Sequence, residues 1–267
     1  MLYLGRNFVL AAVDVADHPL IGIDNVVTVS NIAADSEATG SPATNLANPA
    51  THLKWVSGST SDQSITLTLD GLTEVGFVGI AGHNFGTIGA TVQIDADIAA
   101  VATDLTDDMI PGDDSPLMFW IRPNVQPTEL RINLSTLGDE PFAAVVYVGV
   151  PLSMERRIYS DHTPINQARE IDVSNGRSES GEFLGRVILG EGRKTTAPFK
   201  LFTPAWVREN LLGFIDDAKS LPFFFAWRPS TYPEEVGYVW LSNDPKPKPV
   251  LGDGQLLAFD LDLEGIA

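Results

Sequence analysis

Cysteine is absent from this chain of 267 residues. A chain without cysteine has no disulfide framework, no thiolate zinc or iron–sulfur site and no cysteine nucleophile. Histidine is also scarce, with four residues, and the sequence contains no HExxH motif or other close pair of histidines. The sequence therefore gives no support to a zinc hydrolase.

Basic residues are few: 17 Lys and Arg stand against 35 Asp and Glu, which gives a net charge of −18. A groove for duplex DNA or an anionic lipid surface needs a clustered basic patch, and no such run is present. The short apolar stretch from Phe8 to Val13 is followed by Asp14, which is unlike a signal peptide. We expect a protein made in the cytoplasm, with no nucleic-acid partner and no membrane span.

The charge is distributed unevenly along the chain. Residues 1–152 hold four basic against eighteen acidic residues, whereas residues 153–267 hold thirteen against seventeen. The polarity of the sequence changes at the same place, where the apolar run 143–150 ends at Pro151 and a polar segment follows. We therefore predict two domains, 1–152 and 153–267, with a boundary near Leu152.

The first predicted domain has the pattern of an antiparallel β-sandwich. In the segment 64–69, Ile65, Leu67 and Leu69 alternate with polar residues, as in a half-buried strand. Turn residues separate it from further strand-like runs, and no helical period is sustained. The other predicted strands are 75–81, 91–96, 117–122, 129–135 and 143–150.

The second predicted domain has one convincing helix among strands. Thr203 is a good N-cap, Pro204 suits the first helical position, and an apolar stripe follows at helical spacing. Pro222 ends the pattern. Strands are predicted at 185–189, 222–227, 236–242 and 255–264, with a long polar loop at 243–254. One helix on an antiparallel sheet is an α+β arrangement. The overall prediction is a mainly β chain, a jelly-roll sandwich followed by an α+β domain.

Two motifs in the first domain carry a resemblance to known families. The segments 45–55 (NLANPATHLKW) and 62–71 (DQSITLTLDG), with Ser57 between them, resemble the discoidin-like (coagulation factor type C, galactose-binding-like) jelly roll. Ser64 stands where that family often has a second Trp. The segment 76–87 (GFVGIAGHNFGT) resembles minor tail proteins of long-tailed bacteriophages, in which such a sandwich precedes a tail-tube-like domain.

The resemblance implies a structural virion protein of a phage tail tip or baseplate, without enzymatic activity. The second domain, similar to the distal-tail and tube fold, would form a ring around the tail axis. The first domain would contact neighbours or host carbohydrate. Implied partners are further copies of the chain, other tail proteins (tube, tape measure and hub) and a host-surface glycan. The location would be the tail of the virion.

Two alternatives remain open from the sequence. One is a stand-alone carbohydrate-binding protein that uses the first domain. The other is a polysaccharide hydrolase, because some of the many carboxylates will lie near each other. The sequence contains no G-x-S-x-G elbow and no phosphate loop.

The candidate ligand residues lie around Trp55, whose ring could stack on a sugar, although in the resembled family this Trp is usually part of the core. The flanking polar residues could bind carbohydrate or a structural calcium, or could simply cap turns. These candidate residues are Asn45, Asn48, His52, Trp55 and Asp62. No other cofactor is expected.

Two further groups of residues could each form an interaction surface or could have an ordinary structural role. An acidic loop could bind a cation or a basic partner, or be a solvated loop; it contains Asp104, Asp107, Asp108, Asp113 and Asp114. Arginines and aromatic residues of the second domain could form an assembly interface, with dispersed surface charge and ordinary core packing as the alternatives. The residues chosen for that interface are Arg156, Arg157, Arg186, Arg193, Trp227 and Tyr232.

Overall fold

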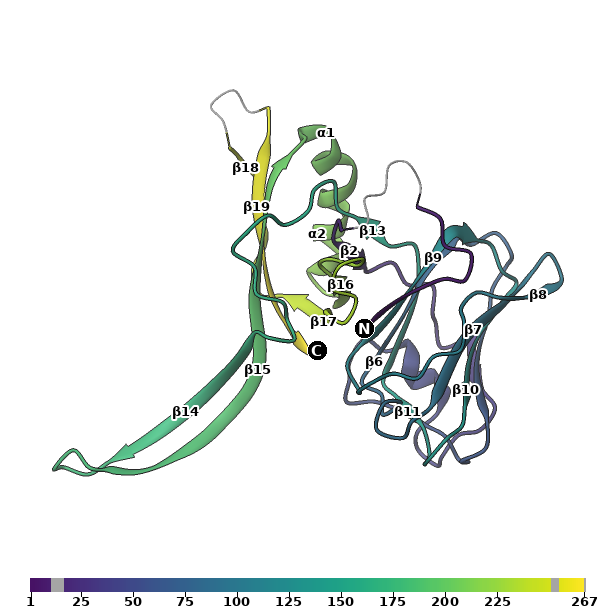
Figure 1. The fold of residues 1–267 in the computed structure, drawn as a ribbon, viewed down its shortest axis with the longest axis horizontal. Coiled ribbons are helices and arrows are strands. Elements are labelled where there is room, and N and C mark those ends of the chain that lie inside the picture. The colour runs from purple at the N-terminus through teal and green to yellow at the C-terminus, as the bar shows by residue number, and fades with distance from the viewer. Residues whose placement is uncertain (11–16, 251–254, 267) are drawn as a thin grey trace.

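The computed structural model describes residues 1–10, 17–250 and 255–266, and the chain is mainly β (Figure 1). An N-terminal jelly-roll sandwich stands beside a second sheet, which carries the helix on one face. From that second sheet a long two-stranded hairpin projects away from the sandwich. Residues 251–254, at the end of the predicted loop 243–254, lie outside the described part. No helix in the described ranges has the length and apolarity needed to cross a membrane.

One sheet of the sandwich is buried on both faces. Its strands run in the order β1-β9-β6-β12, with β1 parallel to β9 and the other neighbours antiparallel. On β6, Val78 and Ile80 face the core of the sandwich, whereas Phe77 and Ala81 face the second sheet. This double burial explains the near-continuous apolar run in the sequence. The bounds are β1 (Leu2–Leu4), β6 (Val75–Ala81), β9 (Leu117–Val125) and β12 (Val145–Gly149).

The other sheet of the sandwich has one face in the core and one in solvent, which explains its alternating sequence. Its order is β3-β5-β10-β7-β8. A short pair, β4 (Trp55–Val56) with β11 (Phe142–Ala143), and the 3-10 turn η1 (Ala43–Ala47) accompany it. The strands are β3 (Ile32–Ala34), β5 (Gln63–Thr68), β7 (Thr91–Ile98), β8 (Val101–Asp104) and β10 (Glu129–Ser135).

The second sheet recruits a strand from near the N-terminus. Its order is β13-β2-β16-β17-β19-β15-β14, and β18 pairs with β19. The strand β2 (Leu20–Gly22) lies between β13 and β16, so the chain enters this sheet before it builds most of the sandwich. The other strands are β13 (Leu152–Ser153), β14 (Arg169–Arg177), β15 (Phe183–Phe202), β16 (Phe223–Ala226), β17 (Val236–Leu241), β18 (Lys248–Pro249) and β19 (Leu257–Ile266).

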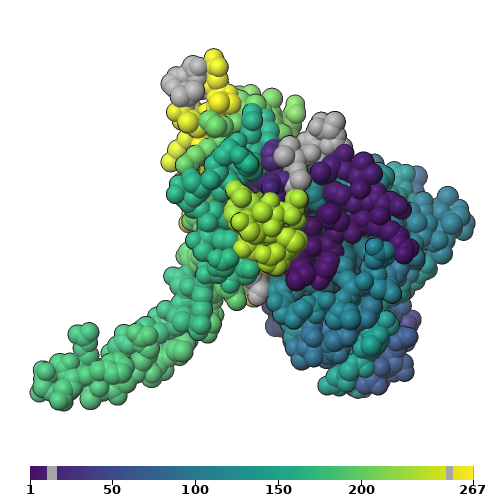
Figure 2. All heavy atoms as spheres, viewed as in Figure 1, coloured from purple at the N-terminus to yellow at the C-terminus, as the bar shows by residue number. Residues whose placement is uncertain are grey.

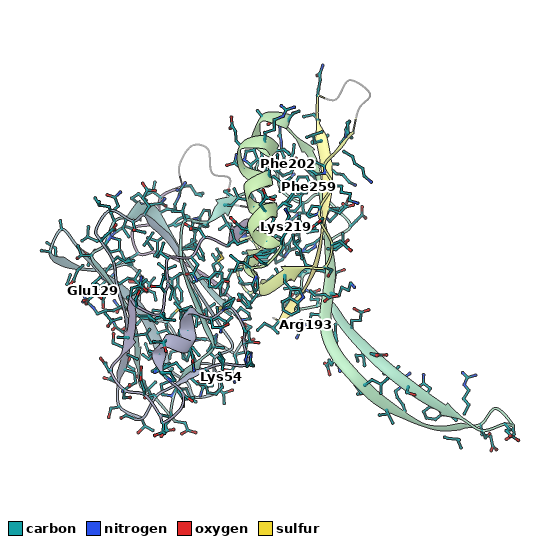
Figure 3. The ribbon with its side chains drawn as sticks, turned by 180° about the vertical axis from the view of Figure 1, so that it is seen from behind. Lys54, Glu129, Arg193, Phe202, Lys219 and Phe259 are labelled. Atoms are coloured by element: carbon teal, nitrogen blue, oxygen red, sulfur yellow. The ribbon has the colours of Figure 1, made fainter. Side chains whose placement is uncertain are left out.

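The helix begins where the sequence predicts. Thr203 accepts a hydrogen bond from Trp206 N at 3.3 Å, and Pro204 occupies the first position. The helix comprises α1 (Pro204–Trp206), a π-helical turn η2 (Val207–Leu211) and α2 (Leu212–Ala218). Its predicted apolar stripe is buried, and the ring of Phe214 meets that of Phe223 edge-on at 5.1 Å. Phe202 and Phe259 lie on the sheet beneath the helix (Figure 3).

An apolar seam joins the sandwich to the second sheet. Phe224 of β16 packs with Tyr147 and Tyr238, and Tyr238 OH donates to Pro49 O at 2.7 Å. Glycines let the two sheets approach, because a Cβ at Gly79 would lie 2.6 Å from the Phe224 ring. The seam thus consists of interlocking apolar side chains. The division into two domains near Leu152 remains a prediction. The strand β2, although it comes before Leu152 in the sequence, belongs to the second sheet.

Candidate functional site

Trp55, the candidate sugar-stacking residue, is fully buried. Its exposed fraction is 0%, and its Nε1 donates a hydrogen bond to Ser36 O at 3.0 Å. Its backbone pairs with Ala143 on β11, and its ring belongs to the core of the sandwich. The ring therefore has no free face for a sugar. This agrees with the alternative that Trp55 is part of the core.

The polar candidates around Trp55 hold loops in place. Asn45 Nδ2 donates to Lys54 O at 2.8 Å, and Asn48 Oδ1 accepts from Ala50 N at 2.9 Å. His52 and Asp62 are exposed. Within residues 1–10, 17–250 and 255–266, no group of three or more His, Asp or Glu side chains is placed to hold a metal ion. The two asparagines therefore have the loop-capping role expected of such residues.

The acidic loop is divided among separate local contacts. Asp104 and Asp107 form ion pairs with Arg6 at 2.7 and 2.8 Å. Asp114 accepts from the backbone N of Thr87 at 2.9 Å, and Asp113 accepts from the backbone N of Ser115 at 3.0 Å. These contacts explain four of the five aspartates as partners of a neighbouring arginine or as turn caps.

Four of the predicted interface residues lie away from the projecting hairpin. Trp227 stacks on Tyr232, with ring centroids 5.6 Å apart, and its indole N–H donates to the Glu235 carboxylate. Burial raises the pKa of Glu235. Arg157 lies over the ring of Tyr159 and, like Arg156, is exposed. The structure therefore places these four residues off the hairpin on which the other two lie.

Arg186 and Arg193 lie on the hairpin of β14 and β15, of which the sequence predicted only a strand at 185–189. We call residues 169–193 the arm. In the space-filling view the arm stands clear of the rest of the molecule (Figure 2). Arg193 marks its base (Figure 3), where the guanidinium donates to the backbone oxygen of Asn166. Farther out, Arg186 Nε donates to Asn175 Oδ1 across the two strands at 2.9 Å.

Apolar side chains lie exposed on both faces of the arm. Val187 pairs with Ser174 and Ile188 with Val173, so these consecutive residues point to opposite faces. Val187 is 62% exposed and Ile188 57%. Phe183, Leu184 and Leu189 are also exposed. Strands with apolar residues on both faces are typical of sheets that are covered on both sides. Nothing in the described part of this chain covers the outer arm.

The tip of the arm is a formed turn. Ser178 N donates to Glu182 O at 2.9 Å, and Gly181 N donates to Ser178 O at 2.9 Å. The Ser178 hydroxyl accepts from Glu182 N at 3.0 Å, while Gly181 has a φ of 86°, a value that favours glycine. The tip therefore presents its flanking residues, Arg177 and Phe183, from a defined scaffold.

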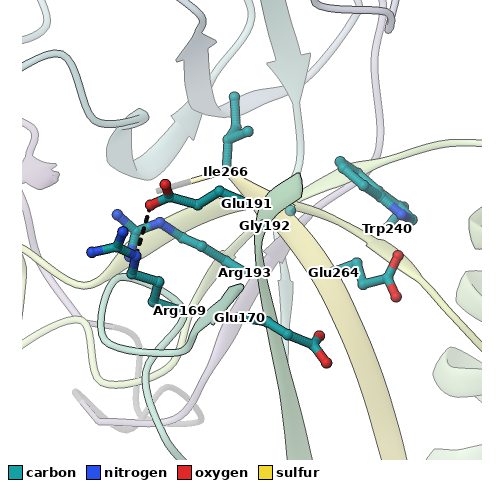
Figure 4. A pocket seen from close by; sticks show the side chains of 9 residues that line it. Arg169, Glu170, Glu191, Gly192, Arg193, Trp240, Glu264 and Ile266 are labelled. Carbon is teal, nitrogen blue, oxygen red and sulfur yellow. Dashed lines mark ion pairs between the residues drawn. The ribbon is translucent and has the colours of Figure 1, made fainter. Parts of the chain in front are cut away.

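A pocket of about 410 Å³ lies at the base of the arm, where β14 and β15 leave the edge of β19 (Figure 4). Trp240, 41% exposed, and Ile266 form its apolar part. Three glutamates also line it. Glu191 pairs with Arg169 at 2.7 Å, and Glu264 pairs with Lys194 at 3.1 Å, which holds the pKa of Glu264 below its ordinary value. Glu170 is the third.

Comparisons with known proteins find similar solved structures but no matching protein family. No protein-family model matches the sequence, and no curated protein matches it. A family 32 carbohydrate-binding module of C. perfringens NanJ, in complex with galactose, is 18% identical with a TM-score of 0.40, covering 48% of this chain and 98% of the module. A chitosan-binding module from Paenibacillus sp. IK-5 is 14% identical with a TM-score of 0.40, covering 49% and 98%.

The similar structures also include a protein with a different printed partner. XRCC1, bound to the DNA polymerase β catalytic domain, is 17% identical with a TM-score of 0.36, covering 45% of this chain and 94% of that one. At TM-scores this low, the three likenesses carry no argument about activity. The description of the fold rests on the strand order and register given above.

Proposed function

We propose that this protein is a structural subunit that assembles with further copies of itself through the arm. The observation that carries the proposal is the exposure of apolar residues on both faces of the outer arm, at Val187 and Ile188. Neighbouring exposed apolar side chains of this kind are typical of an interaction site. The packed apolar seam between sandwich and second sheet supports the same function, because it holds the two parts of a building block together.

The finer form of this proposal is a ring at the distal tail of a long-tailed bacteriophage. It rests on the resemblance of residues 76–87 and on the order of elements in the second part of the sequence. In that setting the second sheet and its arm make the ring. The sandwich lies outside the ring and contacts neighbouring tail proteins or host-surface glycan. The chemistry is assembly by complementary surfaces, without bond making or breaking.

The test combines a mass measurement with imaging. The double variant Val187→Ser with Ile188→Ser removes apolar surface from both faces of the arm. Leu72→Ser is the matched control, because Leu72 is 76% exposed on the sandwich. We expect closed rings in negative-stain electron micrographs of the wild type and of the control, and single subunits for the double variant. Rings formed equally well by the double variant would overturn the proposal.

Carbohydrate binding by the sandwich is the second candidate function. It is favoured by the exposure of His52 and Asp62 on the two segments that resemble galactose-binding-like domains. A glycan array tests it, with Asp62→Ala expected to weaken any binding and Leu72→Ser expected to leave it unchanged. The hydrolase alternative is tested in the same samples, by release of reducing ends from the glycans that bind.

A further inference from the structure

Trp240 belongs to a row of three side chains that crosses the second sheet. It lies directly opposite Glu264 on β19, and Glu264 lies directly opposite Lys194 on β15. Directly opposite side chains share a face of the sheet, and Trp240, two residues after Tyr238, shares the face of the seam. The sandwich covers Tyr238 but leaves Trp240 41% exposed. The row is therefore open to solvent just beyond the seam.

A hollow lies beside this row because a glycine leaves room for it. Gly192, two residues before Lys194, lies opposite Glu170 in the register of the hairpin. The Glu170 side chain is therefore on the same face as the row. A Cβ added to Gly192 would meet nothing within 4 Å. The space there is the pocket at the base of the arm, which Trp240 and Glu170 help to line (Figure 4).

The arginines at the edge of this pocket are engaged away from the row. Arg169 comes directly before Glu170, and successive side chains of a strand point to opposite faces. The same holds for Arg193, directly before Lys194. Arg169 pairs with Glu191 at 2.7 Å, and Arg193 donates to a backbone oxygen of the neighbouring loop. Both guanidinium groups therefore have partners of their own.

The charged groups that share the face of Trp240 balance one another. Lys194 Nζ lies 3.1 Å from the Glu264 carboxylate, and this contact, together with the weaker attraction of Glu170, raises the pKa of Lys194. Lys194 is thus attracted by both carboxylates. Because a carboxylate accepts several hydrogen bonds and an ammonium donates several, these groups can bind further polar atoms.

The ring of Trp240 has no stacking partner in the part of the chain that the structure describes. Trp227 is different, because Tyr232 stacks on it and the guanidinium of Arg228 lies 4.7 Å from its ring centre. An exposed indole beside hydrogen-bonding groups suits a ligand with an apolar face and a polar rim. A pyranose ring has this character, since its C–H groups form the faces and its hydroxyls lie around the edge.

The same face of β19 continues into a second hollow. Asp262 and Asp260 follow Glu264 at every second position of the strand, so they share its face. Both line a hollow of about 680 Å³ together with Lys200. The hydroxyl of Thr196 donates to Asp262 at 2.7 Å. The strand spans roughly 13 Å from Glu264 to Asp260, which is longer than one sugar ring.

We propose that this face of the second sheet binds a neutral oligosaccharide, with one pyranose ring packed on Trp240 and its hydroxyls hydrogen-bonded to Glu264 and Lys194. Further sugars would follow β19 towards Asp262. A hydroxyl both donates and accepts, which matches a carboxylate and an ammonium lying side by side. A polyanion would meet the carboxylates, and a polycation would meet the ammonium. The inference goes beyond the proposed function, because the site needs no second copy of the chain.

The first test is binding of the full chain to an array of neutral oligosaccharides built from glucose, galactose, mannose and N-acetylhexosamines. Isothermal titration calorimetry with the best-bound sugar then gives the affinity. Trp240→Ala is expected to weaken binding by on the order of tenfold or more. Tyr159→Ala is the matched control, because Tyr159 is a 50% exposed aromatic residue that lines neither hollow, and it should leave the affinity unchanged.

A second variant fills the pocket while keeping the tryptophan. Gly192→Leu places a side chain in the open space above the backbone and is expected to abolish binding with the melting temperature unchanged. Gly190→Leu is its control, since a Cβ there also meets nothing within 4 Å but the residue does not line the pocket. Equal affinity of the two leucine variants would overturn the proposed site.

The remaining outcomes separate this inference from the other proposals. Failure to bind any neutral sugar, or binding of oligolysine or a polyuronate alone, would overturn it. Binding that is lost in Asp62→Ala but kept in Trp240→Ala would place the sugar on the sandwich and overturn it too. The chain with Val187→Ser and Ile188→Ser is expected to bind sugar like the wild type. A monomeric wild type that binds sugar through Trp240 would overturn the proposed function and support this inference.

Discussion

Phe224 of β16 lies directly over Gly79 of β6, and a Cβ added to that glycine would come within 2.6 Å of the ring. This contact joins the sandwich to the second sheet at the centre of the seam. Because a side chain at position 79 has no room, the seam depends on the glycine. Through this contact the sandwich packs directly against the second sheet, from which the arm projects.

Gly79→Val is therefore expected to destabilise the whole protein. Overpacking of a close-packed interior costs roughly 1–3 kcal/mol. Gly112→Ala is the control, because a Cβ there meets nothing within 4 Å. Urea unfolding followed by tryptophan fluorescence gives both free energies, and a Gly79→Val chain as stable as the control would contradict the seam.

Phe214→Ala tests the docking of the helix on the second sheet. Phe214 is 4% exposed and meets Phe223 edge-on, so its truncation is expected to cost roughly 3–5 kcal/mol. Leu212→Ala provides a neighbouring comparison, since Leu212 is 47% exposed. Equilibrium unfolding in urea measures both. A loss below about 0.5 kcal/mol at Phe214, the size of an ordinary surface substitution, would show that the stripe is not core.

Trp55→Phe tests the core role of Trp55. Phenylalanine keeps a ring in the core but removes the donor to Ser36 O, leaving a carbonyl without its partner. We expect a loss of roughly 1–3 kcal/mol in the free energy of unfolding. The exposed Trp240→Phe serves as the comparison and should unfold like the wild type. Equal stability of both variants would indicate that Trp55 is not the buried end of the sandwich.

His83 is expected to make stability depend on pH. Its Nε2 lies 2.9 Å from Ser115 O, Nδ1 accepts from Phe85 N at 3.2 Å, and burial lowers its pKa to about 4. The unfolded chain, in which histidine has its ordinary pKa of 6.5, binds the proton more readily. Stability is therefore full above pH 6.5 and falls as the pH drops from 6.5 towards 4, by at most roughly 3 kcal/mol.

Melting temperatures measured across this range give the check. His83→Gln should flatten the profile between pH 6.5 and 4, whereas His52→Gln, at an exposed site, should leave its shape as in the wild type. An unchanged slope in the His83→Gln chain would show that another group causes the pH dependence.

Much of the fold could be predicted from the sequence, because a strand or helix that packs against a core repeats its apolar residues at a regular spacing. The alternation at 129–135 predicted β10 with its observed bounds, and the continuous apolar run at 75–81 predicted β6. The cap at Thr203 located the start of the helix. In each case one chain segment packs against a core in the same molecule, so the local pattern carries the information.

The arm could not be predicted in this way. Its strand β14 packs on no core of its own chain, so its residues show no simple period. Glycines at 185, 190 and 192 make the outer part of β15 resemble turns, although the strand runs from Phe183 to Phe202. The strand β2 was also missed, because three residues give no periodic signal. The apolar residues 187–189 did predict a strand at 185–189, but not its full length or its pairing with β14.

The mass of the purified chain in solution tests the central claim most directly. Light scattering over a range of concentrations is to be compared for the wild type, the Leu72→Ser control and the chain with Val187→Ser and Ile188→Ser. The account predicts a particle of several 28.8 kDa subunits for the first two and a single subunit for the third. A wild-type chain that remains a single subunit at every concentration, with the same mass as the arm variant, would contradict it.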